Sequence, residues 1–292
     1  MNIGVTGATG FIGRRVIEAA LRRGHEVIAF TRRPENNIPG CEMRPYSLDR
    51  PPDIDGCEAL IHLAGESIAG LWTPARKRRI RESRVQGTRL LVEAIQSSAQ
   101  PPEVLVSGSA TGIYPERGEA EIDESTAPGE GFLAGVVRDW EAEALRTATV
   151  CRVVLLRTAV VLGREGGALR AMAPTARFGL AATLGSGRQW MPWIHIEDEA
   201  MLALFAAENL EVRGPLNAVS PWPVRNADFT QALARALRRP AVLRVPAFAL
   251  RLLGDFADEL LDSKRIVPAS ALEYGFRFQF PELEAALREE FS

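Results

Sequence analysis

Three glycines near the start of the chain have the spacing of a loop that binds phosphate groups. Gly7, Gly10 and Gly13 follow an apolar run, residues 2–5, and lead into an amphipathic run that begins at Phe11. In such a turn the first glycine permits a sharp bend, the second admits a pyrophosphate close to the backbone, and the third lets a helix pack against a sheet. Unpaired N–H groups at the helix N-terminus would neutralise the diphosphate. We therefore predict a dinucleotide-binding turn, in which the cofactor contacts are Gly7, Thr9, Gly10, Phe11, Ile12 and Gly13.

The end of the second predicted strand, residues 25–31, carries basic rather than acidic side chains. A carboxylate at this position binds the ribose hydroxyls of NAD, whereas a basic residue accommodates the 2′-phosphate of NADP. The chain has Thr31, Arg32 and Arg33 here, and its next acid is Glu35. A hydroxyl and guanidinium forks suit a phosphate dianion, although a pair of surface arginines before a turn is the plainer interpretation. We predict NADP(H) as the cofactor, bound in part by these three residues.

A further predicted strand, residues 59–65, ends in a tight turn of small and apolar residues. Ligands of parallel sheets bind at such carboxyl ends, so backbone contact between the turn and a cofactor is expected. The turn consists of Leu63, Ala64 and Gly65, whereas His62 before it is interpreted as a packed strand residue. A long helix, residues 73–97, follows. Its basic run, residues 76–81, is interpreted as a solvated face.

Arg84 lies about two turns further along this long helix, toward the part that packs beside the cofactor groove. Because a guanidinium binds phosphates and carboxylates equally well, we expect Arg84 to reach one of these groups.

Hydroxyl groups follow the next predicted strand, residues 104–110, at the point where it leaves the sheet. Ser109 is a candidate hydrogen-bond donor to a substrate oxygen, and Tyr114 lies on the loop that follows. Tyr114 is a candidate proton donor, but an unassisted phenol has a pKa near 10 and is a poor base at neutral pH. Ser109 and Tyr114 are the predicted catalytic residues.

Six predicted strands alternate with helices, which indicates an α/β protein with a Rossmann-type, doubly wound parallel sheet. We expect a cofactor-binding domain at residues 1–163, with later segments near 194–220 returning to it. Residues 164–292 are expected to form a smaller, mixed α/β substrate lobe that includes a C-terminal segment, about 240–292. An aromatic loop, residues 185–193, could line a pocket in that lobe.

The composition is that of an ordinary soluble globular protein, with 46% hydrophobic residues, 25% charged residues and a net charge of -2. This balance argues against nucleic acid as a main partner. Three scattered cysteines suit a reducing compartment and form no recognisable metal cage. No apolar run approaches the roughly 20 residues of a membrane span, and the first strand leaves no room for a signal peptide. We expect a cytoplasmic protein with no metal and no membrane partner.

Together these residues resemble the extended short-chain dehydrogenase/reductase superfamily, within its NAD(P)-dependent epimerase/dehydratase group. Residues 6–13 are similar to its TGxxGxxG signature, and residues 107–110 to the strand end that supplies an active-site serine. More narrowly, residues 63–66, 132–134, 140–141, 193–196 and 260–280 resemble "epimerase family" proteins with a C-terminal segment of unknown function. The resemblance implies NADP(H) binding, with Arg84 and Val161 beside the nicotinamide half. It also suggests a homodimer through the helices at 73–97 and 132–145.

The chain departs from the superfamily at the residues that usually perform the chemistry, a tyrosine and a lysine four residues later. Its tyrosines, Tyr46, Tyr114 and Tyr274, are followed at that spacing by Arg50, Gly118 and Phe278, and its only lysines are Lys77 and Lys264. The standard acid/base pair is therefore missing. Two functions remain open: an NADP(H)-dependent oxidoreductase or epimerase-like enzyme acting on an unknown small carbonyl or hydroxyl compound, and a non-catalytic NADP(H)-binding redox sensor.

Overall fold

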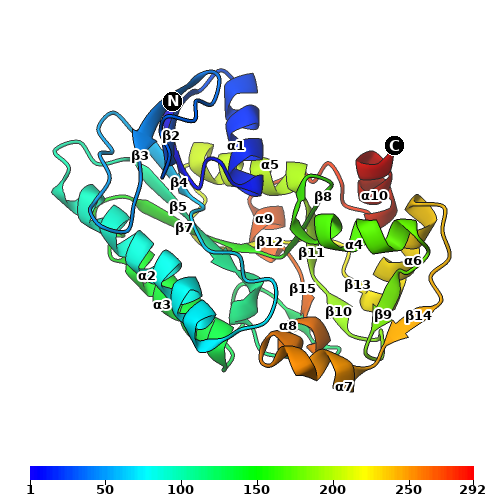
Figure 1. Ribbon diagram of the computed structural model, residues 1–292. Coiled ribbons are helices and arrows are strands. Elements are labelled where there is room, and N and C mark those ends of the chain that lie inside the picture. The colour runs from blue at the N-terminus through cyan, green and yellow to red at the C-terminus, as the bar shows by residue number, and fades with distance from the viewer.

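A seven-stranded sheet forms the centre of the protein in the computed structural model, which describes residues 1–292 (Figure 1). All neighbouring strands of this sheet are parallel. The spatial order is β12-β7-β5-β4-β1-β2-β3, so the chain reverses direction across the sheet between β1 and β4. Ligands bind at such a reversal, beyond the carboxyl ends of the strands. The strands are β1 (Asn2–Thr6), β2 (Glu26–Thr31), β3 (Cys41–Pro45), β4 (Ala59–His62), β5 (Val104–Ala110), β7 (Arg152–Thr158) and β12 (Gly214–Ala218).

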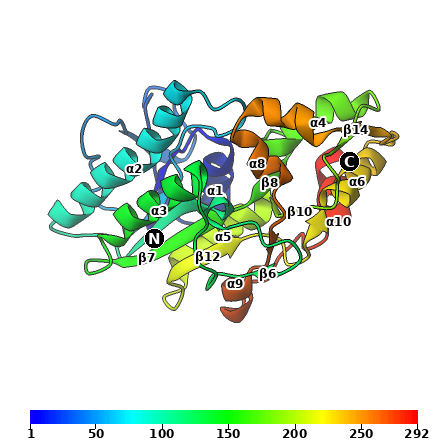
Figure 2. The same cartoon turned by 90° about the horizontal axis from the view of Figure 1, so that it is seen from below.

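Helices cover both faces of the sheet, as a doubly wound fold requires (Figures 1 and 2). Helices α1 (Phe11–Arg22) and α5 (Ile196–Glu208) pack together on one face, and α2 (Pro74–Ser97) and α3 (Phe132–Leu145) pack together on the other. The predicted fold class is confirmed.

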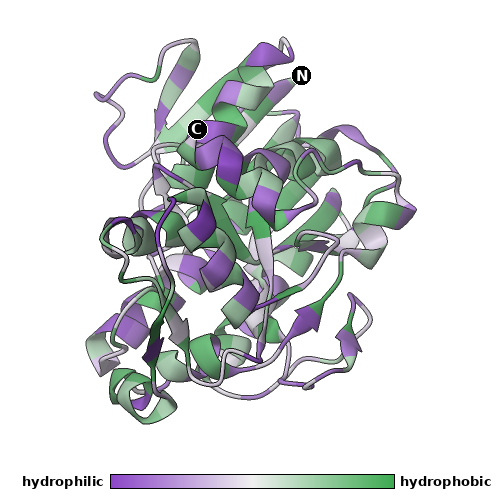
Figure 3. Cartoon of the chain, turned by 90° about the vertical axis from the view of Figure 1, so that its right-hand side faces the viewer, coloured by the Kyte–Doolittle hydropathy of each residue, from purple (hydrophilic) through white to green (hydrophobic).

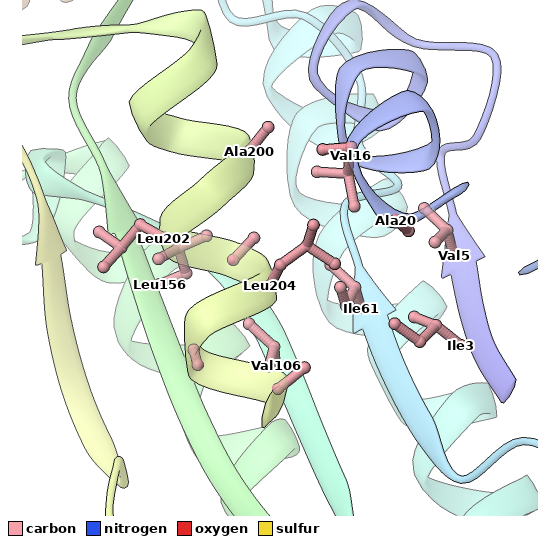
Figure 4. Close-up of a cluster of buried hydrophobic side chains, with 14 of the residues drawn as sticks. Ile3, Val5, Val16, Ala20, Ile61, Val106, Leu156, Ala200, Leu202 and Leu204 are labelled. Atoms are coloured by element: carbon pink, nitrogen blue, oxygen red, sulfur yellow. The ribbon is translucent and has the colours of Figure 1, made fainter. Parts of the chain in front are cut away.

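The larger hydrophobic core lies between the sheet and the α1–α5 layer. Figure 4 shows Val16 of α1 and Leu204 of α5 directed toward strand residues such as Val5 and Ile61. On α1 the buried positions recur three and four residues apart, which places them on one face of the helix. A second core lies between the opposite face of the sheet and α2 and α3. These two cores hold the carboxyl ends of the strands in fixed positions.

The segment near residues 194–220 returns to the sheet, where it contributes α5 and β12. Strand β12 pairs with β7 and raises the number of sheet strands from the expected six to seven. Its sequence, Gly-Pro-Leu-Asn-Ala, has little intrinsic preference for a strand, so its place depends on pairing with β7.

Elements from residues 160–195, 224–245 and 283–291 form a smaller mixed lobe with its own hydrophobic core. Figure 3 turns this lobe toward the viewer and shows hydrophilic and hydrophobic residues intermixed on its outer elements. None of the helices combines the length and the apolar character of a membrane span. The elements outside the sheet and its four helices are η1 (Thr111–Ile113), β6 (Glu121–Ile122), β8 (Val160–Gly163), α4 (Gly167–Arg177), β9 (Ala182–Leu184), β10 (Trp190–Met191), β11 (Trp193–His195), β13 (Val224–Arg225), α6 (Asn226–Ala236), β14 (Leu243–Val245), α7 (Ala247–Leu250), η2 (Arg251–Leu253), α8 (Phe256–Leu261), β15 (Arg265–Ile266), α9 (Ala269–Glu273) and α10 (Leu283–Phe291).

The C-terminal segment is tied back to the sheet domain. Strand β15 pairs with β6, and α9 packs against β12. The carboxylate of Asp198 on α5 accepts hydrogen bonds from the backbone N–H groups of Gln279 and Phe280, at 2.7 and 2.9 Å. The tail therefore forms part of the architecture that surrounds the site.

Candidate cofactor and substrate site

The glycine turn between β1 and α1 has no room for side chains. Gly7 has a φ of 69°, and a Cβ on it would lie 2.8 Å from the carbonyl carbon of Leu63. A Cβ on Gly13 would collide with the carbonyl oxygen of Gly7. The turn therefore packs directly against the loop after β4. At the exposed Gly10 no side chain covers the backbone, so a ligand can approach it.

The N-terminus of α1 is open to an anion. Gly10 is the N-cap residue, no side chain caps the helix, and its first turn contains no acid. The first helical hydrogen bond runs from the N–H of Arg14 to the carbonyl of Gly10, at 3.0 Å. The N–H of Gly10 donates to the carbonyl of Gly7, so the amide groups of residues 11–13 are available to a ligand at the positive end of the helix dipole.

A cleft of about 1140 Å³ joins this turn to the end of β2. Thr9 lines the cleft from the turn, and Thr31, Arg32 and Arg33 line it from the strand end. The backbone N–H of Arg33 donates to the hydroxyl of Thr31 at 3.3 Å, which holds the turn after β2. Arg32 and Arg33 are exposed and form no ion pair, and the same is true of Arg14 on the opposite wall. Three guanidinium groups without an ion pair therefore surround this concave surface, and its one acid, Glu18, pairs with Arg15 at 2.7 Å. This environment favours an anion.

A second cleft, of about 670 Å³, continues from Thr9 and Phe11 toward the smaller lobe. The lobe contributes Gly163 and Gly166, which pack so closely on the Phe11 ring that neither has space for a Cβ. Val161 is only 7% exposed, and its side chain lies in the central core. The side chain of Val161 therefore packs in the core. A contact between Val161 and a cofactor could involve its backbone alone.

The turn after β4 is held in place by Thr6. The hydroxyl of Thr6 accepts hydrogen bonds from the N–H groups of Leu63 and Ala64, at 3.2 and 3.3 Å. The same hydroxyl contacts Nδ1 of His62 at 2.6 Å, and Nε2 of His62 contacts the hydroxyl of Thr88 on α2 at 3.0 Å. Burial lowers the pKa of His62 to about 4, so the ring is neutral near pH 7. His62 is thus a structural residue, as expected, and it links the strand ends to α2.

Arg84 lies beside the exposed Gly65, where a Cβ would be 3.3 Å from its guanidinium carbon. Its guanidinium donates to the backbone carbonyls of Glu66 and Ile80 and lies 5.2 Å from the Trp140 ring centroid. Burial lowers the pKa of Arg84 to about 10, which leaves it charged at neutral pH. No carboxylate pairs with it. Arg84 is therefore a half-buried cation next to the predicted turn, and it has guanidinium N–H groups that bind no other protein group.

Ser109 and Tyr114 are brought together in one buried network, and both are tied to other protein groups. Ser109 is 4% exposed, and its hydroxyl donates to Oε1 of Glu141 at 2.5 Å. Tyr114 is 2% exposed; its hydroxyl donates to Oδ1 of Asn217 at 2.7 Å and accepts from Arg157 at 2.8 Å. Burial raises the pKa of Tyr114 to about 12, although Arg157 opposes the rise. The phenol is therefore enclosed and held by two protein partners, so the proton transfer predicted for Tyr114 would require these contacts to open.

Glu141 and Arg157 connect the two halves of this network and were missed as site residues. Arg157 donates from Nε and from a terminal nitrogen to the two oxygens of Glu141, at 2.8 and 2.9 Å. A signal was present in the sequence: Leu133, Val137 and Glu141 recur every four residues, which places the acid on the buried face of α3.

The aromatic loop does not line either cleft. Trp193 is buried in the core of the smaller lobe, and Trp190 packs between Arg225 and Arg265. Trp193 is therefore a core residue, whereas the pocket role predicted for Trp190 stays a prediction. His195 has the structural role expected of it: it caps α5 and lies 3.1 Å from Glu290.

The strand order, the glycine turn and the open helix N-terminus define an α/β protein of the Rossmann type. The chain belongs to the NAD dependent epimerase/dehydratase family, whose model matches residues 3–218. A second model, a domain of unknown function (DUF1731), matches residues 245–290. These matches confirm the resemblance inferred from the sequence.

Relatives from distant organisms match almost the whole chain. The epimerase family protein SDR39U1 of Mus musculus is 38% identical over 296 residues, covering 99% of each chain. YfhF of Bacillus subtilis is 35% identical over 296 residues, covering 99% of this chain and 97% of YfhF. The crystal structure of human SDR39U1 (isoform 2) with NADPH superposes with a TM-score of 0.92 at 35% identity, covering 99% of both chains. UDP-glucose 4-epimerase from Thermotoga maritima shares the fold, with a TM-score of 0.80 at 19% identity, covering 100% of this chain and 97% of the epimerase.

Proposed function

We propose that this protein binds NADP(H) and acts as an oxidoreductase or epimerase-like enzyme on a small carbonyl or hydroxyl compound. One observation carries the cofactor assignment: three unpaired arginines and the hydroxyls of Thr9 and Thr31 line one cleft beside an uncapped helix N-terminus. The human relative was crystallised with NADPH, which supports the same cofactor here.

The residues of the first cleft and of the neighbouring turn after β4 fit the parts of this cofactor. The backbone amides after Gly10 would hold the pyrophosphate, and Arg32 and Arg33 would hold the 2′-phosphate. The turn at residues 63–65 would lie against the adenosine and its ribose. Bound NADP(H) supplies hydride transfer, and the protein supplies binding and orientation. Arg84 would neutralise a phosphate of the cofactor or a carboxylate of the substrate.

Ser109 is a candidate for contact with substrate. Because its proton is donated to Glu141, the lone pairs of its oxygen are free to accept a hydrogen bond. Ser109 would then orient a substrate hydroxyl rather than polarise a carbonyl, which favours a hydroxyl compound as the substrate.

A second function is supported by the Tyr114 network. With the usual tyrosine and lysine absent and Tyr114 enclosed, the chain offers no evident proton donor to a reacting oxygen. In this alternative the protein binds NADP(H) as a redox sensor, and the conformation of the bound state is recognised by a partner protein.

The cofactor assignment is tested by NADPH and NADH titration of the purified protein and of Arg32→Ala. Loss of a charge-assisted phosphate contact should weaken NADPH binding by about 10- to 100-fold and leave NADH binding nearly unchanged. Arg79→Ala, on the exposed face of α2, is the matched control. Equal loss of both nucleotides in Arg32→Ala would contradict the 2′-phosphate assignment.

The enzyme and the sensor are separated by a turnover screen of carbonyl and hydroxyl compounds with NADPH and NADP⁺. Turnover that falls in Ser109→Ala, with NADPH affinity retained, is expected for the enzyme. Tight NADPH binding without turnover across the panel would favour the sensor.

A further inference from the structure

The smaller lobe exposes an unusual number of large apolar side chains along one edge. Phe178 is 84% exposed, Val242 79%, Phe248 76% and Leu252 81%, and Leu180 and Leu243 are also exposed. Single exposed apolar residues are common, but contiguous groups of them mark interaction surfaces.

Strand pairing brings these residues together from two distant parts of the sequence. Leu180 bridges to Ala241, and β9 then pairs with β14 as far as Leu184 and Val245. The paired segment is about 13 Å long at the usual rise of a strand. Phe178 precedes one end of this ladder, and Phe248 on α7 follows the other. Figure 1 shows β14 at the outer right of the lobe, leading to α7 at its lower edge.

The same two segments carry arginines and no acid. Residues 166–196 and 229–254 contain no Asp or Glu, although acids number 37 in the 292-residue chain and about seven would be expected in these segments at that frequency. Exposed arginines that form no ion pair lie along the edge: Arg177, Arg238, Arg239, Arg244 and Arg251.

Of the four acids at residues 255–262, three have other partners and one, Asp258, is exposed without an ion pair. Asp255 pairs with Lys77 of α2, and Glu259 and Asp262 each lie 3.7 Å from Lys264. We define the basic apolar edge as Arg177, Phe178, Leu180, Arg238, Arg239, Val242, Leu243, Arg244, Phe248, Arg251 and Leu252.

We propose that the basic apolar edge is a peripheral binding surface for membranes that contain anionic phospholipids. Arginines attract the headgroup phosphates, and the neighbouring Phe, Leu and Val side chains can enter the boundary between headgroups and acyl chains. A nucleic acid would use the arginines but not the aliphatic side chains. A protein partner would be expected to seat its anchors in a pocket, whereas the described clefts lie elsewhere on the molecule.

This proposal departs from the expectation, based on sequence, of no membrane partner. The overall composition does not reveal the basic apolar edge, because acids elsewhere in the chain balance the positive charge of the edge. The edge is also independent of the cofactor clefts, so membrane binding can be tested apart from the proposed function.

Flotation of the full-length protein with vesicles tests the proposal. We expect binding to phosphatidylcholine vesicles in which about a third of the lipid is phosphatidylserine, and little binding to pure phosphatidylcholine. The double variant Arg239→Glu/Arg244→Glu should reduce binding at least about 25-fold, at about fivefold for each arginine removed. Phe248→Ser/Leu252→Ser should also reduce it, through loss of the inserted side chains.

Matched controls are Arg79→Glu on α2 and Leu210→Ser, an exposed leucine after α5, both of which should bind vesicles like the wild type. NADPH affinity serves as a check that each variant is folded. Absence of binding to the anionic vesicles would overturn the proposal, and so would equal binding by all variants. Binding to poly-glutamate through the same arginines, without binding to vesicles, would replace the membrane by an acidic polypeptide.

Discussion

At the scale of single residues, the burial of Glu199 has a consequence for stability. This carboxyl on α5 has no solvent exposure; Thr158 donates to one of its oxygens at 2.6 Å, and the other has no partner. Burial raises its pKa to about 8 from an ordinary value of 4.5. Between these values the native protein keeps the proton while the unfolded chain loses it. Stability should therefore fall as the pH rises through this window.

Glu199→Gln keeps the shape of the side chain and removes its titration. We expect similar stability to the wild type near pH 5 and greater stability at pH 8, by on the order of 4 kcal/mol at most. Urea unfolding of both proteins at the two pH values measures the difference, with Glu165→Gln as an exposed control. A difference that does not grow with pH would show that Glu199 is ionised in the native protein.

At the scale of elements, one ion pair joins α3 to β7 beneath the candidate substrate site. Glu141 and Arg157 are both almost fully buried, and Ser109 of β5 and Tyr114 after η1 are bonded to them. Removing one member would leave the other as an unpaired buried charge. The pair therefore determines how the helix, the strand and the serine are placed relative to one another.

Glu141→Leu should lower the free energy of unfolding by about 3–5 kcal/mol, because Arg157 loses its partner. The double variant Glu141→Leu/Arg157→Met should recover most of this loss, since no charge is then buried. Urea unfolding measures both. The exposed pair Arg235–Glu284 is the control, and Glu284→Leu should cost no more than about 1 kcal/mol. A similar loss in the free energy of unfolding for Glu141→Leu and Glu284→Leu would refute the structural role of the buried pair.

At the scale of the whole molecule, the C-terminal segment completes the core rather than forming a separate unit. Ala271 and Phe276 belong to the same hydrophobic cluster as the sheet strands. The hydroxyl of Ser220 donates to the carbonyl of Pro281, and Asn217 of β12 donates to the carbonyl of Val267. Deleting this segment would expose apolar core and strip buried polar groups of their partners.

A chain truncated after Arg239 should consequently lose cooperative unfolding and aggregate, and the isolated segment should not fold. Near-ultraviolet circular dichroism and urea unfolding of the truncated chain check this, with Asp198→Asn in the full chain as a milder comparison. Cooperative unfolding of the truncated chain at the wild-type midpoint would mean that the sheet domain is independent of its tail.

Features that depend on residues near one another in the chain can be predicted from the sequence. The spacing of Gly7, Gly10 and Gly13 predicts the turn, and apolar periodicity predicts the strands and the helices of the doubly wound sheet, including the bounds of α3. The basic end of β2 is local in the same way, and its implied cofactor agrees with the NADPH in the human structure. Local spacing decides such features because backbone sterics, helix periodicity and turn geometry act over a few residues.

Features that depend on contacts between distant residues become visible in the folded chain alone. Tyr114 is 103 residues from Asn217, and Glu141 is 16 residues from Arg157 on a different element. Whether a hydroxyl is enclosed or available depends on these partners and not on its neighbours in sequence. β12 becomes a strand because β7 offers it unpaired backbone groups, and the basic apolar edge exists because β9 pairs with β14. Desolvation and pairing across the fold, which no local pattern encodes, set the chemistry of these residues.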